Sequence, residues 1–250
     1  MQSLPIKLDV RNVSHRFARQ NILESISFTL HTGKSTVFLG PSGVGKTTLF
    51  RICADLIEAE KGKLTRYYTN LGYMFQSPRL LPWQTAFENM ALALKARHTR
   101  SHEIRERVIH TAKMLGLTAD DLTKYPYQLS GGMQSRVAMA RALIIQPDVL
   151  SLDEPFTGLD IGLKSELMQV LKAELQKGTA ILLITHELAD AVELADQILL
   201  LSGEPGKIIE SITIDTPVHT RDPAVLNHEL QRLMTNPKVA EAFALKKGFL

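Results

Sequence analysis

A glycine-rich segment at residues 40–47, GPSGVGKT, constrains this chain more than any other part of the sequence. It satisfies the pattern G-x-x-x-x-G-K-[ST] at every fixed position. A compact apolar run at 36–39 precedes the segment and is typical of a strand, and the pattern of 47–56 predicts a helix after it. A strand, a glycine turn and a helix in this order direct backbone N–H groups at phosphate oxygens.

The residue types of this loop predict how it binds a nucleoside triphosphate. We expect Lys46 to reach the β- and γ-phosphates and the hydroxyl of Thr47 to hold Mg²⁺. A glycine-rich turn that matches by chance is the alternative, and the flanking strand and helix disfavour it. The motif does not specify the reaction. The predicted nucleotide-binding residues of the loop are Gly40, Pro41, Ser42, Gly43, Val44, Gly45, Lys46, Thr47 and Thr48.

The rest of the sequence predicts an α/β fold with a mainly parallel sheet. Residues 149–152 and 180–184 have the composition of buried strands, and a helix is expected between them at about 162–176. Strands that alternate with helices imply parallel pairing. A mostly helical segment, about 84–127, interrupts this alternation, and proline and glycine punctuate its ends. We therefore expect a helical subdomain inserted into an α/β core.

Composition excludes several classes of function. The chain has 250 residues, 44% of them hydrophobic, which suits one large domain. Its net charge is only +3, so no nucleic-acid partner is expected. The single cysteine, Cys53, allows no intramolecular disulfide and favours a reducing compartment. The longest apolar runs fall far short of the roughly 20 residues that span a bilayer, so we expect no membrane crossing.

Polar residues follow the expected strands, at the end where α/β sheets bind ligands. Asp153 and Glu154 come directly after the strand 149–152. The first carboxylate can reach a Mg²⁺ ion, and the second can accept a proton from an attacking water. A solvated acidic pair is the alternative, which a complete phosphate loop disfavours. Gln76 and His186 also follow expected strands, but each is uninformative when taken alone.

A second anion-binding feature lies at 129–133, LSGGM. Ser130, Gly131 and Gly132 open a helix, whose N-terminus favours negative charge. One chain thus carries two helix starts suited to phosphate but only one phosphate loop. An N-capped helix after a flexible turn is the alternative interpretation.

These motifs resemble those of the ATP-binding-cassette ATPases, and the resemblance covers nearly the whole chain. The phosphate loop and Leu129 to Met133 match the family's first motif and its signature, and the acids of 152–155 match the strand-end pair. Segment 157–160, which ends at Asp160, resembles the D-loop. Gln76 resembles the Q-loop glutamine and His186 the switch histidine. All of these motifs occur in the family's order.

The resemblance implies a head-to-tail homodimer with ATP and Mg²⁺ at its interface. Ser130, Gly131 and Gly132 of one subunit would close over the phosphate held by Lys46 of the other. Gln76, with Thr47 and Asp153, would hold or sense Mg²⁺.

The same resemblance assigns roles to four more residues. Glu154 would polarise the attacking water and His186 would contact the γ-phosphate, while Asp160 would couple the two sites. Phe17 would stack on adenine, for which ordinary core packing is the alternative.

The family's organisation predicts one domain over 1–250 with subdivisions. Segments 1–83 and 146–215 would form the nucleotide-binding core, including an N-terminal antiparallel β subdomain. Segment 84–145 would be the helical signature subdomain. Segment 216–250 would be a C-terminal helical extension, in which Asp222 and Pro223 open a helix that packs through leucines.

Several stretches are similar to importer ATPases of the nitrate, sulfonate and taurine class. They are 77–83, Glu88-Asn89, the signature with Met133 where glutamine is common, and 202–208. This implies transmembrane permease subunits, a solute-binding protein, and a cytoplasmic location on the inner face of the membrane. Trp83 would anchor the permease contact, with a core tryptophan as the alternative. Segment 63–73 is shorter than usual in the family.

Other classes remain as alternatives to the importer. An exporter ATPase ranks second. An ATPase acting on ribosomes or DNA typically has a second cassette or a long coiled coil, which this sequence lacks. A small-molecule kinase leaves the motif at 129–133 without a role, and a regulatory subunit that does not hydrolyse ATP conflicts with Glu154 and His186.

Overall fold

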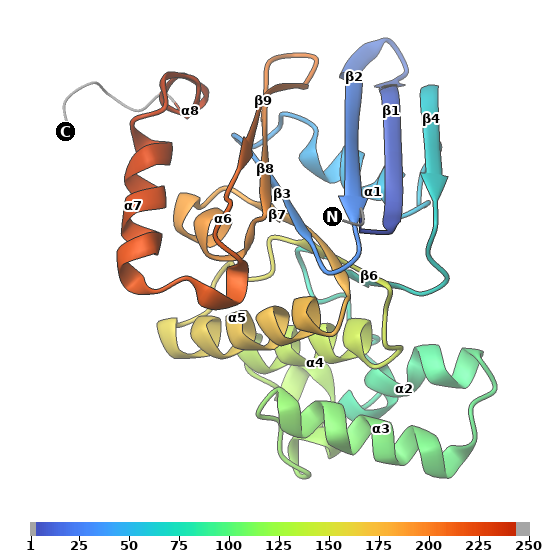
Figure 1. Ribbon diagram of the computed structural model, residues 1–250. Helices are drawn as coiled ribbons and strands as arrows, with labels where there is room; N and C mark the ends of the chain where they lie inside the picture. The colour runs from blue at the N-terminus through green and yellow to red at the C-terminus, as the bar shows by residue number, and fades with distance from the viewer. Residues whose placement is uncertain (1–3, 244–250) are drawn as a thin grey trace.

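The computed structural model describes residues 4–243, which form two sheets and the helices around them (Figure 1). The smaller sheet is antiparallel, with strand order β2-β1-β4. Its strands are β1 (Ile6–Phe17), β2 (Gln20–His31) and β4 (Lys61–Arg66). β1 and β2 pair along most of their length, with several register shifts that mark bulges or irregularities.

The larger sheet has the order β5-β6-β7-β3-β8-β9, in which only the edge strand β9 is antiparallel to its neighbour. Every residue of β3, β6 and β7 is buried, as expected for parallel strands covered on both faces. The mainly parallel sheet and the N-terminal antiparallel sheet are therefore confirmed. The strands are β3 (Ser35–Leu39), β5 (Leu71–Met74), β6 (Val149–Asp153), β7 (Ala180–Thr185), β8 (Gln197–Ser202) and β9 (Lys207–Thr213).

Helices cover the larger sheet unevenly. In Figure 1, α2, α3 and α4 gather at the bottom, far from the antiparallel sheet, and α7 stands beside α6. Short 3₁₀ turns occupy Asp121–Thr123, Pro126–Gln128 and Val218–Thr220. The helices are α1 (Lys46–Cys53), α2 (Ala86–Ala96), α3 (Ser101–Met114), α4 (Gly131–Leu143), α5 (Ile161–Gln176), α6 (Leu188–Leu194), α7 (Pro223–Met234) and α8 (Pro237–Ala242).

The central strand β3 divides the apolar core in two. Phe38 points toward α1 and the antiparallel sheet, whereas Val37 and Leu39 join the cluster formed with α2 to α5. Phe38 also packs edge-to-face between Phe28 of β2 and Phe50 of α1. This stacking holds α1, and with it the preceding glycine loop, between the two sheets.

Three local expectations can be compared with the structure. The helix after the phosphate loop ends at Cys53 rather than at 56, and Cys53 is buried as expected. The core alternative for Trp83 is wrong, because its exposed fraction is 70%. Asp222 does cap α7, and the leucines of this helix pack against the core as expected, with Leu233 buried and Leu226 and Leu230 half-buried.

Two expectations concern the chain ends and membrane crossing. Residues 244–250 of the expected C-terminal extension lie outside the described residues. Among residues 4–243, no helix is long and apolar enough to cross a membrane.

Candidate active site

The glycine loop between β3 and α1 has a conformation that needs glycine. Gly43 and Gly45 have φ of 85° and 97°, in the left-handed region. A Cβ on Gly45 would lie 2.9 Å from the side chain of Leu23, and one on Gly40 would collide with the carbonyl oxygen of Leu201. A Cβ on Gly43 would meet nothing within 4 Å. The loop is therefore packed tightly on its inner side and open at Gly43, where an anion can approach.

Lys46 begins α1 and lies across this loop. Its ammonium donates to the carbonyl oxygens of Gly40 and Pro41 at 2.7 and 2.8 Å. Burial lowers the pKa of Lys46, and the nearby carboxylates of Glu154 and Asp153 oppose that shift. A cation held at the mouth of an N–H-rich loop suits a polyphosphate ligand.

Asp153 ends β6 and lies against the start of α1. Burial raises the pKa of its carboxyl, and a hydrogen bond with the Thr47 side chain acts in the opposite direction. Hydroxyl and carboxylate oxygens are donors that Mg²⁺ prefers, with phosphates and water as further ligands. The described residues contain no group of three or more His, Cys, Asp or Glu side chains suited to a metal. The oxygen atoms of Thr47 and Asp153 thus fit a Mg²⁺ ion whose remaining ligands come from the nucleotide and water.

Glu154 brings the predicted catalytic residues together. Its carboxylate accepts a hydrogen bond from Gln76 Nε2 at 3.0 Å and lies 3.4 Å from His186 Nδ1. Its backbone has φ of 49° and its N–H donates to the carbonyl oxygen of Ile184 at 3.0 Å. A non-glycine residue in the left-handed region is strained, and such strain is often found at functional sites. The turn after β6 thus aims this carboxylate toward both partners.

Sheet order explains this convergence. Gln76 follows β5, Glu154 follows β6 and His186 follows β7, and these strands are adjacent and parallel. Their carboxyl ends therefore meet at one edge of the sheet, next to the glycine loop. A hollow of about 360 Å³ occupies this edge. It is lined by Ile22, Ser42, Gly43, Gly45, Lys46, Thr47, Thr48, Gln76 and Glu154.

Replacing Lys46 by alanine should weaken ATP binding. The variant loses a charged hydrogen-bond donor to phosphate, and such bonds contribute about 1.5–3 kcal/mol, so Kd should rise about 10- to 100-fold. Calorimetric titration with ATP measures the change. Lys172→Ala, on α5, is the control that should keep the wild-type Kd. An unchanged Kd for Lys46→Ala would contradict the assignment.

The predicted signature residues do not line this hollow. Ser130 caps α4, with its hydroxyl accepting from Met133 N at 3.3 Å. Ser130 and Gly131 are exposed, and a Cβ on Gly131 would meet nothing within 4 Å. Gly132 packs toward the side chain of Leu163. The second helix start is therefore open to the outside and separate from the phosphate loop of its own chain.

Several other predicted residues are not part of the lining either, namely Gly40, Pro41, Val44, Asp153, His186, Phe17 and Asp160. Phe17 ends β1, packs edge-to-face on His15 at 4.7 Å, and is 49% exposed, so its core alternative is wrong. Asp160 caps α5 by accepting from Leu163 N at 2.9 Å, a structural role that the sequence interpretation did not assign.

Two residues of this site had no predicted role of their own, although one of them belongs to the predicted D-loop segment 157–160. Thr157 donates its hydroxyl to Glu154 Oε2 at 3.3 Å, and Ile22 lines the hollow. Thr157 is three residues after Glu154, so a predicted turn after β6 would have placed the two side chains close together. Ile22 carries no chemical signal, because it arrives from β2 through tertiary packing alone.

The glycine loop, the strand-end acids and the parallel sheet together define a P-loop nucleoside triphosphatase. The ABC transporter family model matches residues 23–157, more than half of the chain. The chain belongs to the ABC transporter family, as one of its ATP-binding, ATP-hydrolysing subunits.

Individual relatives agree with this family. The chain is 31% identical to an aliphatic sulfonates import ATP-binding protein of Bacillus licheniformis, with 98% of each chain covered. It is 39% identical to a protein of the same description from Rhodococcus jostii, with 80% of each covered. A solved dimeric ATP-binding cassette, in a post-hydrolysis state with ADP and Pi, superposes with a TM-score of 0.75 at 26% identity. That superposition covers 82% of this chain and 98% of the other.

Proposed function

We propose that two copies of this chain pair head to tail, hydrolyse ATP at two shared sites and thereby power the import of a small organic anion. The observation that carries this proposal is the division of the phosphate-binding features. Lys46 and Glu154 share one hollow, whereas Ser130 and Gly131 are open to the outside on another part of the surface. A second copy can supply the missing signature residues to each hollow. The solved dimeric cassette bound to ADP and Pi supports this pairing.

Within each shared site, the proposed roles follow from the contacts of the side chains. Glu154 accepts a proton from the attacking water, and His186 beside it donates to the γ-phosphate. Thr47, Asp153 and Gln76 would hold Mg²⁺. The amide nitrogen of Gln76 donates to Glu154, so its amide oxygen would be the ligand. The ion supplies charge neutralisation for phosphoryl transfer when bound.

Three further residues complete the proposed site. Phe17 stacks on adenine from an exposed strand end. Asp160, at the start of α5, couples the two sites across the dimer. Gly132 joins Ser130 in contacting the γ-phosphate of the partner's nucleotide.

The proposed organisation follows the predicted divisions of the chain. Segments 1–83 and 146–215 form the nucleotide-binding core, and 84–145 carries α2, α3 and the signature helix α4. Segment 216–250 is the C-terminal extension that begins before α7.

The imported substrate is proposed to be an aliphatic sulfonate or a similar small anion. The two relatives described above both carry names of sulfonate importers. The ATPase would bind permease subunits at the inner face of the cell membrane, with a solute-binding protein completing the complex. Trp83 is 70% exposed close after Gln76, which suits a permease contact near the ATP site.

Purification of the tagged chain from its native membrane in mild detergent tests this proposal. We expect a multi-span permease to co-purify, with a solute-binding protein beside it, and the recovery to fall in Trp83→Ala. Tyr67→Ala, at another exposed aromatic, is the matched control. Recovery of ribosomal or DNA-repair proteins without a permease would contradict the transport role.

A further inference from the structure

An ion-pair network links α5 to the residues around His186. The ammonium of Lys164 on α5 lies 2.8 Å from a carboxylate oxygen of Glu187 and 2.5 Å from one of Asp190. Asp190 lies in α6, and Glu187 precedes that helix as its N-cap. The Asp190 side chain is only 3% exposed, so Lys164 meets a carboxylate that has little access to water.

The same network binds the turn that carries His186. The backbone N–H of Glu187 donates to Thr185 Oγ1 at 3.0 Å. The Thr185 hydroxyl in turn donates to Asp190 at 3.5 Å. The residues on both sides of His186 are thereby anchored. The His186 side chain itself is 46% exposed, and its Nδ1 lies 3.4 Å from the carboxylate of Glu154.

The other end of the network reaches the segment between β6 and α5. Lys164 is in the first turn of α5, where its backbone N–H donates to the carbonyl oxygen of Asp160 at 2.9 Å. Its ammonium also lies 5.9 Å from the ring centroid of Phe156, two residues after Glu154. One lysine therefore contacts the segments that carry the proposed catalytic base, the proposed coupling residue and His186.

The buried carboxylate keeps this lysine in place. Burial raises the pKa of Asp190, and the hydrogen bond from Lys164 opposes the shift. A buried carboxylate without a cation is costly, so the pair resists separation far more than an exposed ion pair would.

We propose that Lys164 is a positioning residue for ATP hydrolysis, which holds the turn bearing His186 against Glu154 through Glu187 and Asp190. This inference rests on the catalytic role of His186 in the proposed function. Because a displacement of about 1 Å can cost about 100-fold in rate, loss of the anchor should act on turnover rather than on nucleotide affinity.

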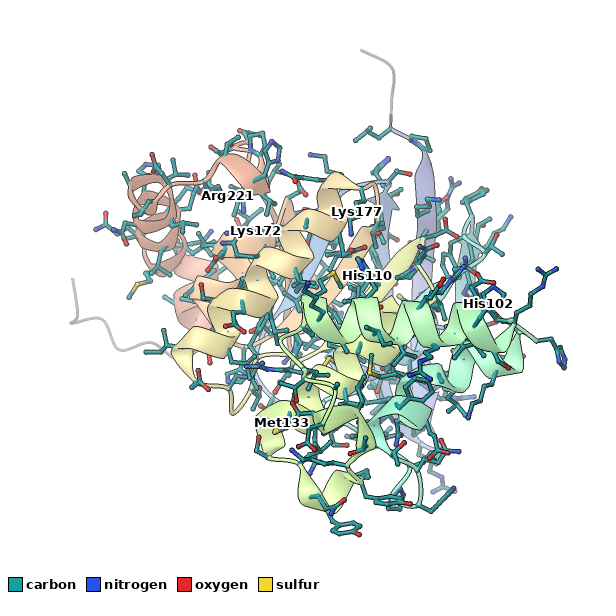
Figure 2. The ribbon with its side chains drawn as sticks, turned by 90° about the horizontal axis from the view of Figure 1, so that it is seen from below. His102, His110, Met133, Lys172, Lys177 and Arg221 are labelled. Carbon is teal, nitrogen blue, oxygen red and sulfur yellow. The ribbon has the colours of Figure 1, made fainter. Side chains whose placement is uncertain are left out.

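The chain offers a matched control on the same two helices. Lys172 of α5 lies 2.8 Å from Glu193 of α6, and its side chain is 13% exposed. Figure 2 shows Lys172 on α5, farther along that helix from its N-terminal turn. Removing either lysine deletes one cation between α5 and α6, but only Lys164 touches residues beside His186.

Steady-state ATP hydrolysis by the full chain is the first test. We expect Lys164→Met to lower kcat at least about tenfold with KM within about twofold, and Lys164→Arg to recover most of kcat. Lys172→Met should stay within about twofold of wild type. Equal kcat values for Lys164→Met and Lys172→Met would overturn the inference.

A second variant and a spectroscopic readout guard against misfolding. Lys164→Met/Asp190→Asn removes both charges, so no unpaired buried carboxylate remains, and it should still show low kcat. The imidazole signal of His186, assigned with His186→Gln, should move in that variant and stay fixed in Lys172→Met. An unmoved signal, or wild-type kcat in the double variant, contradicts the inference.

Different results would refute the role of His186 and the role of Lys164. A His186→Gln variant with wild-type turnover would refute the proposed role of His186. An inactive His186→Gln variant beside a fully active Lys164→Met variant would refute the positioning role of Lys164 alone.

Discussion

Replacing Glu154 by glutamine is expected to lower ATP turnover by about a thousandfold while ATP stays bound. Glutamine keeps the shape of the side chain and can still accept hydrogen bonds from Gln76 and Thr157, but it does not take a proton from water. In the proposed dimer, hydrolysis would therefore be blocked after the nucleotide has closed the two chains together. Phosphate release measures the loss, and sizing chromatography with ATP and Mg²⁺ should show the accumulated dimer.

Glu166→Gln is the matched control for this prediction. Glu166 is on α5, its side chain is 65% exposed, and it pairs only distantly with Arg136, at 3.6 Å. Its turnover should be that of wild type. A Glu154→Gln variant that turns over within threefold of wild type, or elutes only as a monomer with ATP, would refute the catalytic role.

The second large effect is expected on stability, at Arg221. Its buried guanidinium donates to the carbonyl oxygens of Val192, Ala195 and Thr216 at 2.6, 2.8 and 2.9 Å. α6 ends at Leu194, so two of these carbonyls belong to the end of the helix and its negative dipole. Arg221→Met leaves the carbonyls without a donor, and the free energy of unfolding should fall by about 3 kcal/mol.

Chemical denaturation measures this loss, with Arg107→Met as the control. Arg107 is on α3 and pairs with Glu103 at 2.6 Å, and the two side chains are 35% and 39% exposed. Because exposed pairs contribute about 0–1 kcal/mol, its variant should lose far less. Equal losses in the two variants would show that Arg221 does not anchor the C-terminal segment to α6.

Local pattern was sufficient to predict the elements of the site but not their grouping. The loop at 40–47 is defined by consecutive residues, and its strand and helix are formed as expected. Residue pattern alone predicted Gln76 and His186 only as strand-end residues, and their roles at the site came from the family resemblance. Their contacts with Glu154 depend on the order β5-β6-β7, which spacing along the chain does not encode.

Residues that act through tertiary contacts were missed for a related reason. A lysine such as Lys164 on an amphipathic helix is normally solvated, and its partner Asp190 is on another helix. The role of Arg221 could likewise not be predicted from the sequence, because its acceptors are backbone carbonyls, which every residue has. Trp83 was noticed in the sequence, but residue type alone could not decide between a core position and the exposed position that it has.

The most direct test of the shared ATP site uses mixed dimers in which both chains carry Glu154→Gln, so that bound ATP is retained. One dimer has Lys46→Ala on one chain and Ser130→Arg on the other. If each site combines Lys46 of one chain with Ser130 of its partner, one site stays intact and one ATP is retained per dimer. The control dimer has both substitutions on the same chain, and neither of its sites is intact. Retention of ATP by the control dimer and not by the first would contradict the shared site.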